Sequence, residues 1–293
     1  FRSRMIETVI TLGFLAQVLR ISVQYGLAAM GGAITERAGV IDLAIEAKLL
    51  FGAFAAAAVA YATDSLAAGI AAGVTAGALV AAVQLWCALR LAADQVIVGV
   101  GLNIFALGGT RFLLQLLFGE GANSPSCPSL GDAVLENPIV WLAVLAAIAT
   151  PIAIARLRWG LRLRAAGDRP AALVAVGASP VRSRVWAGLF GGALAGAGGA
   201  QLSLSIGGFV ADMSSGKGYI ALAMVILSGW RPTWAALCCL GIAIVEALAI
   251  QLQLRGAGIP SELASLLPYV LTLVVLAIGG VLRPPPRALG KLE

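Results

Sequence analysis

The sequence contains no histidine among its 293 residues, and only 12% of its residues are charged. Histidine-based catalysis and His-ligated metal or haem sites are therefore excluded. The chain also lacks a Cys-x-x-Cys pair, so its four cysteines (Cys87, Cys127, Cys238 and Cys239) predict neither a disulfide framework nor a zinc site. No Walker A motif occurs, so we expect no cofactor on this chain and assign no catalytic residues.

Apolar residues take the place of the missing charges. They make up 60% of the chain, more than a soluble protein of this size could bury. Runs long enough to cross about 30 Å of hydrocarbon recur at residues 6–34, 45–62, 65–91, 95–118, 138–155, 184–204, 218–230, 233–253 and 263–282. The pattern predicts an all-α, polytopic transmembrane helix bundle of about eight to ten spans, organised as a single domain over residues 1–293.

Glycines recur at four-residue spacing in two of these runs. Gly69, Gly73 and Gly77 form one stripe, and Gly192 and Gly196 form another. Small residues on one helix face let two backbones approach closely in lipid. We expect these stripes to pack inside the chain, and a subunit interface is the alternative.

The charge is concentrated in one segment. Residues 156–184 hold seven arginines and one aspartate, and so carry the whole net charge of +6. Short basic loops stay in the cytoplasm, so this loop and the C-terminal tail are predicted to be cytoplasmic, with 119–137 and 205–217 outside. Arg2 and Arg4 favour an inner N-terminus, whereas a single first span would place them outside. A nucleic-acid partner is not expected, because the basic excess lies beside membrane spans.

A polar segment interrupts the first two apolar runs. Six of the fourteen residues in 35–48 are polar or charged, Asp42 and Glu46 among them. The segment is either a short solvated loop or a broken, re-entrant helix near 35–47 whose backbone and carboxylates line a cavity.

A second polar group lies in the fourth run. Asp94 is suited to cap a helix start, and Asn103 lies about two turns further in, at membrane depth. The amide of Asn103 must find a partner there, either on another helix or in a polar pathway.

The basic loop itself contains a helix signal. Asp168 is a candidate N-cap, Pro170 falls in the first turn, and Gly177 suits the left-handed position after the last turn. The helix between them is nearly all small or apolar. We expect it to dock against another chain, or to lie on the lipid surface.

Five segments in order resemble one family. They are residues 35–41 (TERAGVI), 93–103 (ADQVIVGVGLN), 163–172 (LRAAGDRPAA), 216–223 (GKGYIALA) and 228–232 (SGWRP). Together they resemble the permease subunits of ABC importers of the nucleoside and basic-membrane-protein type, relatives of ribose and branched-chain amino-acid permeases. The chain departs from the family's Asn-Ile-Gly at Asp42-Leu43-Ala44, from a glycine at Ala47 and from a methionine at Lys48.

The resemblance implies a transport subunit rather than an enzyme, in a bacterial inner membrane. Its expected partners are a second homologous permease, a separate cytoplasmic ABC ATPase that binds ATP and magnesium, and an extracytoplasmic substrate-binding lipoprotein, besides membrane lipid. The expected coupling helix comprises Asp168, Arg169, Pro170, Ala171, Ala172, Leu173 and Gly177. Arg162, Arg164 and Arg169 would pair with acidic groups of the ATPase or with anionic lipid.

For the substrate pathway the sequence nominates Glu46, Asn103 and Phe209, with Asp42 as a further candidate. An amide, a carboxylate and an aromatic ring suit a nucleoside or a purine-like solute, which offers a π-face and several hydrogen-bonding groups. The alternatives are an ABC permease for a sugar or a branched-chain amino acid, and an ion-coupled secondary transporter that uses an intramembrane acid such as Glu246.

Overall fold

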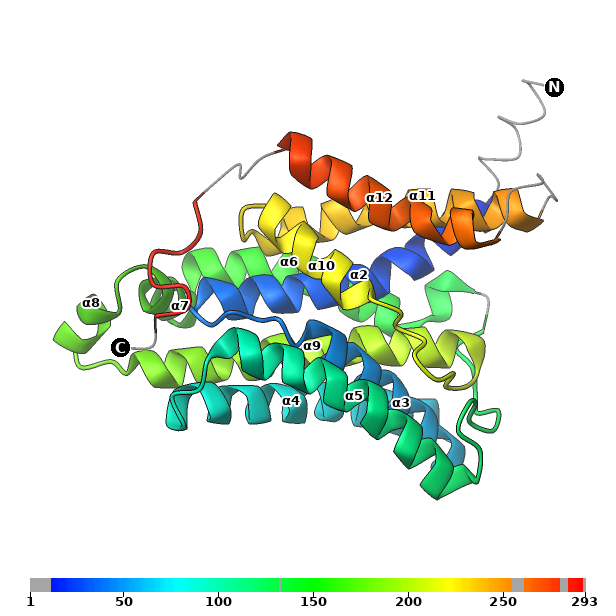
Figure 1. The fold of residues 1–293 in the computed structure, drawn as a ribbon. Coiled ribbons are helices and arrows are strands. Elements are labelled where there is room, and N and C mark those ends of the chain that lie inside the picture. The colour runs from blue at the N-terminus through cyan, green and yellow to red at the C-terminus, as the bar shows by residue number, and fades with distance from the viewer. Residues whose placement is uncertain (1–11, 132, 255–260, 280–283, 292–293) are drawn as a thin grey trace.

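The computed structural model describes residues 12–131, 133–254, 261–279 and 284–291. Figure 1 shows a bundle of helices. The elements are α2 (Leu12–Arg37), α3 (Ile45–Thr63), α4 (Leu66–Arg90), α5 (Gln95–Phe118), a 3-10 turn η1 (Val134–Glu136), α6 (Pro138–Arg156), α7 (Arg158–Asp168), α8 (Pro170–Ala175), α9 (Pro180–Ile206), α10 (Lys217–Leu227), α11 (Pro232–Leu254) and α12 (Ser261–Gly279). The predicted all-α fold is confirmed.

Six helices within the described residues are long and apolar enough to cross a membrane: α3, α4, α5, α6, α9 and α11. α10 has 11 residues, too few for a full crossing. The lower limit of eight predicted spans is reached only when α2 and α12 are added. α2 has 26 residues, but it carries Arg20 and ends on Glu36 and Arg37.

The glycine stripes pack inside the chain, as expected. A Cβ added at Gly77 of α4 would lie 2.3 Å from the Gly192 carbonyl oxygen of α9, and one at Gly73 would lie 2.9 Å from the Gly52 carbonyl oxygen of α3. α2 crosses α9 equally closely, because a Cβ at Gly31 would lie 2.2 Å from the Gly191 carbonyl oxygen. Glycine therefore sets the distances between the central helices.

Two helices begin part-way along the bundle. α2 is followed by an irregular segment, 38–44, and then by α3, whereas α9 is followed by 207–216 and then by α10. In Figure 1 both α3 and α10 start near the middle of the bundle and run toward opposite ends. Their first turns touch, because a Cβ added at Gly218 would lie 2.5 Å from Glu46 N. The predicted break near 35–47 is thus re-entrant: the chain reverses direction after α2, and α3 begins inside the bundle (Figure 1). Residues 207–216 make the same reversal between α9 and α10. We call α3 and α10 the discontinuous helices.

The loops divide between the two ends of the bundle. α7, α8 and the tail 284–291 lie together at one end (Figure 1). The tail is fixed there by hydrogen bonds from Ala288 N to the Gly167 carbonyl (2.7 Å) and from Gly290 N to the Gly39 carbonyl (3.1 Å). The segments predicted to be cytoplasmic therefore share one end, and which side of the membrane that end faces stays a prediction.

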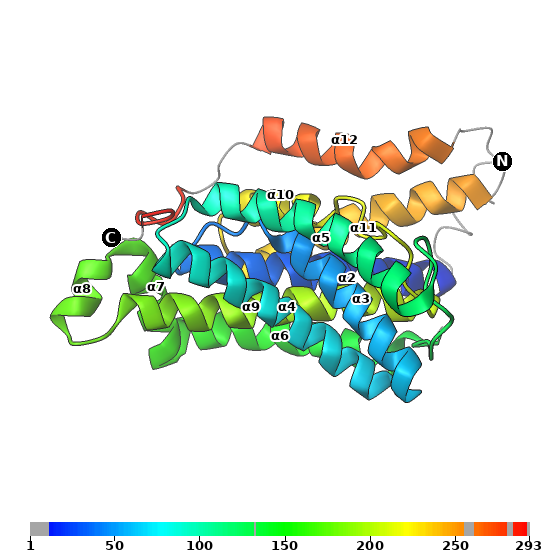
Figure 2. The same ribbon diagram turned by 60° about the horizontal axis from the view of Figure 1, so that its bottom comes forward.

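The segments predicted to be external meet at the opposite end. Residues 122–130 run along the end of α9 and the loop after it, with Cys127 N donating to the Gly207 carbonyl (2.9 Å) and Leu130 N to the Leu204 carbonyl (3.0 Å). α2 begins at this end, and α12 lies at the edge of the bundle beside α11 (Figure 2). Arg2 and Arg4 lie outside the described residues.

The basic loop differs from the prediction in one respect. Asp168 is not an N-cap: it is the last residue of α7, and Arg169 occupies the cap position of α8 without a side-chain cap bond. The reason is Pro170, since the residue before a proline is disfavoured in helical conformation and the break therefore falls at Arg169. Gly177 does adopt the predicted left-handed conformation, with φ of +73°.

Candidate functional site

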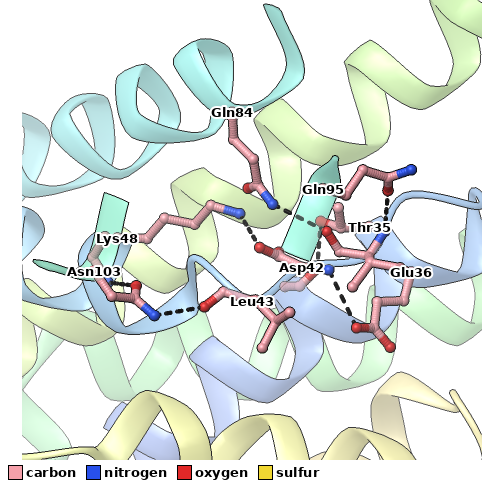
Figure 3. A network of polar contacts seen from close by, with 11 residues as sticks. Thr35, Glu36, Asp42, Leu43, Lys48, Gln84, Gln95 and Asn103 are labelled. Atoms are coloured by element: carbon pink, nitrogen blue, oxygen red, sulfur yellow. Dashed lines mark hydrogen bonds and ion pairs between the residues drawn. The ribbon is translucent and has the colours of Figure 1, made fainter. Parts of the chain in front are cut away.

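The break between α2 and α3 is held by buried polar side chains (Figure 3). The chain leaves α2 through Gly39, whose φ of +98° favours glycine. The Glu36 carboxylate accepts from Asp42 N (3.2 Å) and from the indole N–H of Trp230 (2.6 Å). Gln95 Oε1 accepts from Ile41 N (2.7 Å). The irregular backbone of 38–44 is therefore satisfied inside the protein, as membrane depth requires.

Asn103 of α5 forms hydrogen bonds to the backbone at the break. Its Oδ1 accepts from Ala47 N in the first turn of α3 (3.0 Å), and its Nδ2 donates to the Leu43 carbonyl (2.8 Å) and to the Tyr219 hydroxyl (3.0 Å). Asp94 caps α5 as predicted, by accepting from Val96 N and Ile97 N. Asn103 thus finds the hydrogen-bond partners that its depth requires, on residues 43–47 and on α10.

Asp42 and Lys48 form a buried ion pair within this network. Lys48 Nζ lies 2.5 Å from Asp42 Oδ1, and the two side chains are 0% and 1% exposed. Asp42 Oδ2 has no hydrogen-bond partner among the described residues. Two of the departures from the family pattern therefore contact each other in space.

Glu46 joins the two discontinuous helices. Its Oε1 accepts from Ser214 Oγ (2.6 Å) and Gly216 N (2.8 Å), and its Oε2 accepts from Gly218 N (2.6 Å). A carboxylate at the start of α10 is favoured by the free N–H groups and the dipole of that helix. Glu46 therefore holds α10 in place.

Phe209 lies apart from these three residues. It is 1% exposed and packs edge-on against Phe54 of α3, with ring centroids 5.4 Å apart. The structure thus brings Asp42, Glu46 and Asn103 together at the break and places Phe209 in a neighbouring apolar cluster. All four are buried.

A second polar cluster was not predicted as a unit. Lys217 Nζ lies 2.8 Å from Glu246 Oε1, and the Tyr25 hydroxyl donates to Glu246 Oε2 (2.7 Å). Tyr269 donates its hydroxyl to the Ser215 carbonyl. The cluster lines a cavity of about 190 Å³ between α2, α10, α11 and α12, which we call the tyrosine cavity.

This cluster differs from the Asp42–Lys48 pair in its access. Lys217 and Glu246 are 18% and 17% exposed, so their charged groups reach the cavity. The Lys217 ammonium also lies 5.2 Å from the centre of the Tyr25 ring. The sequence alone does not predict this cluster, because its residues lie on helices that are far apart in the chain.

The basic loop presents an apolar surface at the end of the bundle. Val174 and Val176 are 63% and 75% exposed, whereas Leu173 is 4% exposed and anchors α8 to the protein. Asp168, Arg169, Ala171, Ala172 and Gly177 are also exposed, and Pro170 is half-buried. The short helix therefore projects its apolar side chains outward.

Comparison with known proteins gives these features a family context. The family model "Branched-chain amino acid transport system / permease component" matches residues 14–276. The chain is 29% identical to the guanosine ABC transporter permease protein NupQ of Bacillus subtilis, over 85% of this chain and 86% of the relative. It is 30% identical to the nucleoside ABC transporter permease protein NupC of Lactococcus lactis, with the same coverage.

A further relative is named for a different substrate. The putative glucose ABC transporter permease protein TsgC13 of Haloferax volcanii is 30% identical, over 91% of this chain and 92% of the relative. No solved structure matches the chain significantly.

Proposed function

Since the chain belongs to the family of permease components of branched-chain amino acid transport systems, we propose that it forms half of the pathway of an ATP-driven importer for nucleosides and related purine-like solutes. The other half would be a second, homologous permease. A cytoplasmic ABC ATPase would supply the energy, and an extracytoplasmic lipoprotein would deliver the substrate. The chain itself would be a transport subunit of a bacterial inner membrane, with α8 and the tail in the cytoplasm.

The tyrosine cavity carries the assignment of the substrate class. It combines a hydrogen-bond donor, Lys217, an acceptor, Glu246, and the rings of Tyr25 and Tyr269. A nucleobase presents adjacent donor and acceptor atoms on its edge and a flat face that stacks on aromatic rings. At about 190 Å³ the cavity is below the roughly 300–1,000 Å³ of sites for drug-sized ligands, so it would take the nucleobase alone and leave the ribose outside.

The position of the cavity fits import. Glu246 lies in the second half of α11, toward the end of the bundle opposite α8. With α8 in the cytoplasm, the tyrosine cavity lies in the outer half, where a lipoprotein would release the substrate. An ion-coupled site at Glu246 is less suited to this geometry, because the Lys217 ammonium already balances the carboxylate charge that would attract a cation.

The discontinuous helices would form the moving part. Asp42, Glu46 and Asn103 hold the first turns of α3 and α10, and Phe209 packs on α3 beside them. Irregular backbone near the midplane of transporters lines the cavities through which substrates pass. The pathway would open where these turns separate, exposing the spare oxygen of Asp42.

Coupling to the ATPase would start at α8. The exposed apolar side chains of Val174 and Val176 would dock in a groove of the ATPase. The tail then connects the end of α7 to the break, since Ala288 contacts Gly167 and Gly290 contacts Gly39. A rigid-body displacement of α7 and α8 would reach the discontinuous helix through this link.

Uptake of labelled guanosine by the reconstituted importer tests the substrate class. We expect inosine to compete and glucose and leucine not to compete. Tyr269→Leu should raise the KM of uptake about 5- to 140-fold, the effect of losing one base–aromatic stack, with the maximal rate changed little. Tyr269→Phe should keep the KM near that of the wild type. Val270→Leu, at the neighbouring position that is 53% exposed, is the control.

The result that would overturn the substrate class is uptake of glucose or leucine that guanosine does not inhibit. The pathway residues have a separate test. Asn103→Ala and Glu46→Ala should abolish uptake while ATPase docking persists, and full uptake by both variants would remove these residues from the pathway.

A further inference from the structure

Arg184 is a buried arginine about one turn inside α9. α9 begins at the end of the bundle that carries α7 and α8 (Figure 1). The residue is 1% exposed and is the largest of the fully buried side chains in the described part of the chain. Arginine is almost never fully buried unless it is paired. The groups that Arg184 binds therefore explain how the charge can stay inside.

Three backbone carbonyls accept from the Arg184 guanidinium, and each belongs to a different segment. Nη2 donates to the Lys291 carbonyl of the tail (2.8 Å) and to the Ala166 carbonyl of α7 (3.5 Å), and Nε donates to the Ala38 carbonyl after α2 (3.4 Å). The bond to the tail is the shortest of the three. A buried charge needs its hydrogen bonds, so the guanidinium stays satisfied only while all three segments remain in place.

The three segments also contact one another directly. Ala288 N donates to the Gly167 carbonyl (2.7 Å), and Gly290 N donates to the Gly39 carbonyl (3.1 Å). A Cβ added at Gly167 would overlap the Arg37 carbonyl oxygen, so the ends of α2 and α7 touch backbone to backbone. We use the term junction for residues 37–39, 166–167 and 288–291 together with Arg184.

The junction lies between the two parts of the chain that would move. On one side, α7 leads directly into α8. On the other side, residues 40–44 continue the break, and Gln95 ties them to the tail. Its Oε1 accepts from Ile41 N (2.7 Å), and its Nε2 donates to the Gly290 carbonyl (3.2 Å). A displacement of α7 would therefore reach the break through the junction.

We propose that Arg184 is a positioning residue for energy coupling. Because it binds all three segments at once, it makes the end of α7, the tail and the start of the break move as one body when the ATPase closes. This inference rests on the proposed function and adds the side chain on which the transmission depends. Without the guanidinium, α7 would move while the break stayed in place, and ATP would be hydrolysed without transport.

The uptake per ATP hydrolysed, measured in the reconstituted importer, tests the proposal. Arg184→Met removes the charge and the donors but keeps a long side chain. We expect the ratio to fall about fivefold or more, the lower end of coupling between distant sites, while the ATPase stays bound. Arg184→Lys keeps the charge and one donor nitrogen and should recover part of the ratio. Arg182→Met, at an exposed position of the same helix, is the matched control and should keep the ratio of the wild type.

Hydrogen exchange of backbone amides gives a readout that does not depend on the solute. Within residues 40–44, Ile41 N and Asp42 N are hydrogen-bonded and report on the break. ATP binding to the assembled wild-type importer should change the exchange both in α7 and α8 and in residues 40–44. In Arg184→Met the change in α7 and α8 should persist, and the change in residues 40–44 should be lost.

A variant of the tail tests the same link without altering Arg184. Gly290 has a φ of +78°, which is strained for a β-branched residue, and an added Cβ would lie 3.0 Å from Ile41 Cδ1. Gly290→Val should therefore displace the tail and abolish the ATP-dependent change in residues 40–44. This variant keeps the inference testable if Arg184→Met does not assemble.

Two results would overturn the inference. One is a wild-type ratio in Arg184→Met together with an ATP-dependent change in residues 40–44. The other is a proportional fall of uptake, hydrolysis and melting temperature in Arg184→Met and Arg184→Lys alike, because that pattern would show a structural role. A wild-type importer whose α7 and α8 do not respond to ATP would instead contradict the proposed function itself, and the inference with it.

Discussion

The Asp42–Lys48 pair allows a quantitative prediction about the interior of the bundle. At an N–O separation of 2.5 Å, the Coulomb attraction is about 7 kcal/mol for an effective dielectric constant of about 20. Removing both ions from water costs several kcal/mol each. The two effects nearly cancel, so the intact pair adds little net stability, but a single remaining ion would be buried without a counter-charge.

Single substitutions should therefore be damaging and the double substitution should not. Lys48→Met strands a carboxylate that is 1% exposed, and Asp42→Asn strands an ammonium that is 0% exposed. Each should cost about 3–5 kcal/mol, or roughly 6–10 °C in melting temperature at about 2 °C per kcal/mol. Asp42→Asn/Lys48→Met, which leaves no ion, should melt within about 3 °C of the wild type.

Melting of the detergent-purified protein, followed by intrinsic tryptophan fluorescence, measures the cycle. The coupling free energy between the two sites should reach about 4.5 kcal/mol or more, above the usual range of about 0.5–3 kcal/mol for contacting residues, because each single variant leaves a buried charge unpaired. Additive effects of the two single substitutions would refute the reasoning. So would a double variant that melts below both single variants, because the ion pair would then contribute net stability.

Three further predictions follow from other parts of the chain. Gly77→Ala should destabilise the protein by about 1–3 kcal/mol in the same melting assay, because its Cβ would lie 2.3 Å from a backbone oxygen, whereas Gly108→Ala, with nothing within 4 Å, should not. Val174→Asp should abolish co-purification of the ATPase without lowering the melting temperature, since Val174 is 63% exposed; retained ATPase would exclude α8 as the docking element. Burial raises the pKa of the Cys127 thiol, which keeps the reactive thiolate scarce at neutral pH. An impermeant maleimide should label Cys127 slowly in intact cells at pH 7, and the labelling rate should rise about tenfold for each unit of increasing pH until the pH reaches that pKa. Labelling only after lysis would invert the topology.

Features that depend on local sequence were predictable. The Asp94 cap, the left-handed Gly177 and the break near 35–47 all follow from residues close together in the chain. The N-cap prediction at Asp168 is wrong for a local reason too, because Pro170 disfavours helical conformation at Arg169 and so places the break after Asp168.

Long-range contacts were not predictable from one sequence. In the sequence Asp42 and Lys48 are two separate departures from a family pattern, and only the fold shows that they form a pair. The need of Asn103 for a partner was clear from its depth, but not that Leu43 and Tyr219 would supply it. The tyrosine cavity was missed for the same reason, since Tyr25 and Glu246 are 221 positions apart.

The energy source of uptake tests the central claim most directly. The chain is reconstituted into liposomes with its second permease, its ATPase and its lipoprotein, and uptake of labelled guanosine is measured with ATP inside or with an ion gradient alone. The account predicts uptake that requires ATP hydrolysis and is lost when the ATPase is omitted. Uptake driven by the ion gradient without ATP would contradict it.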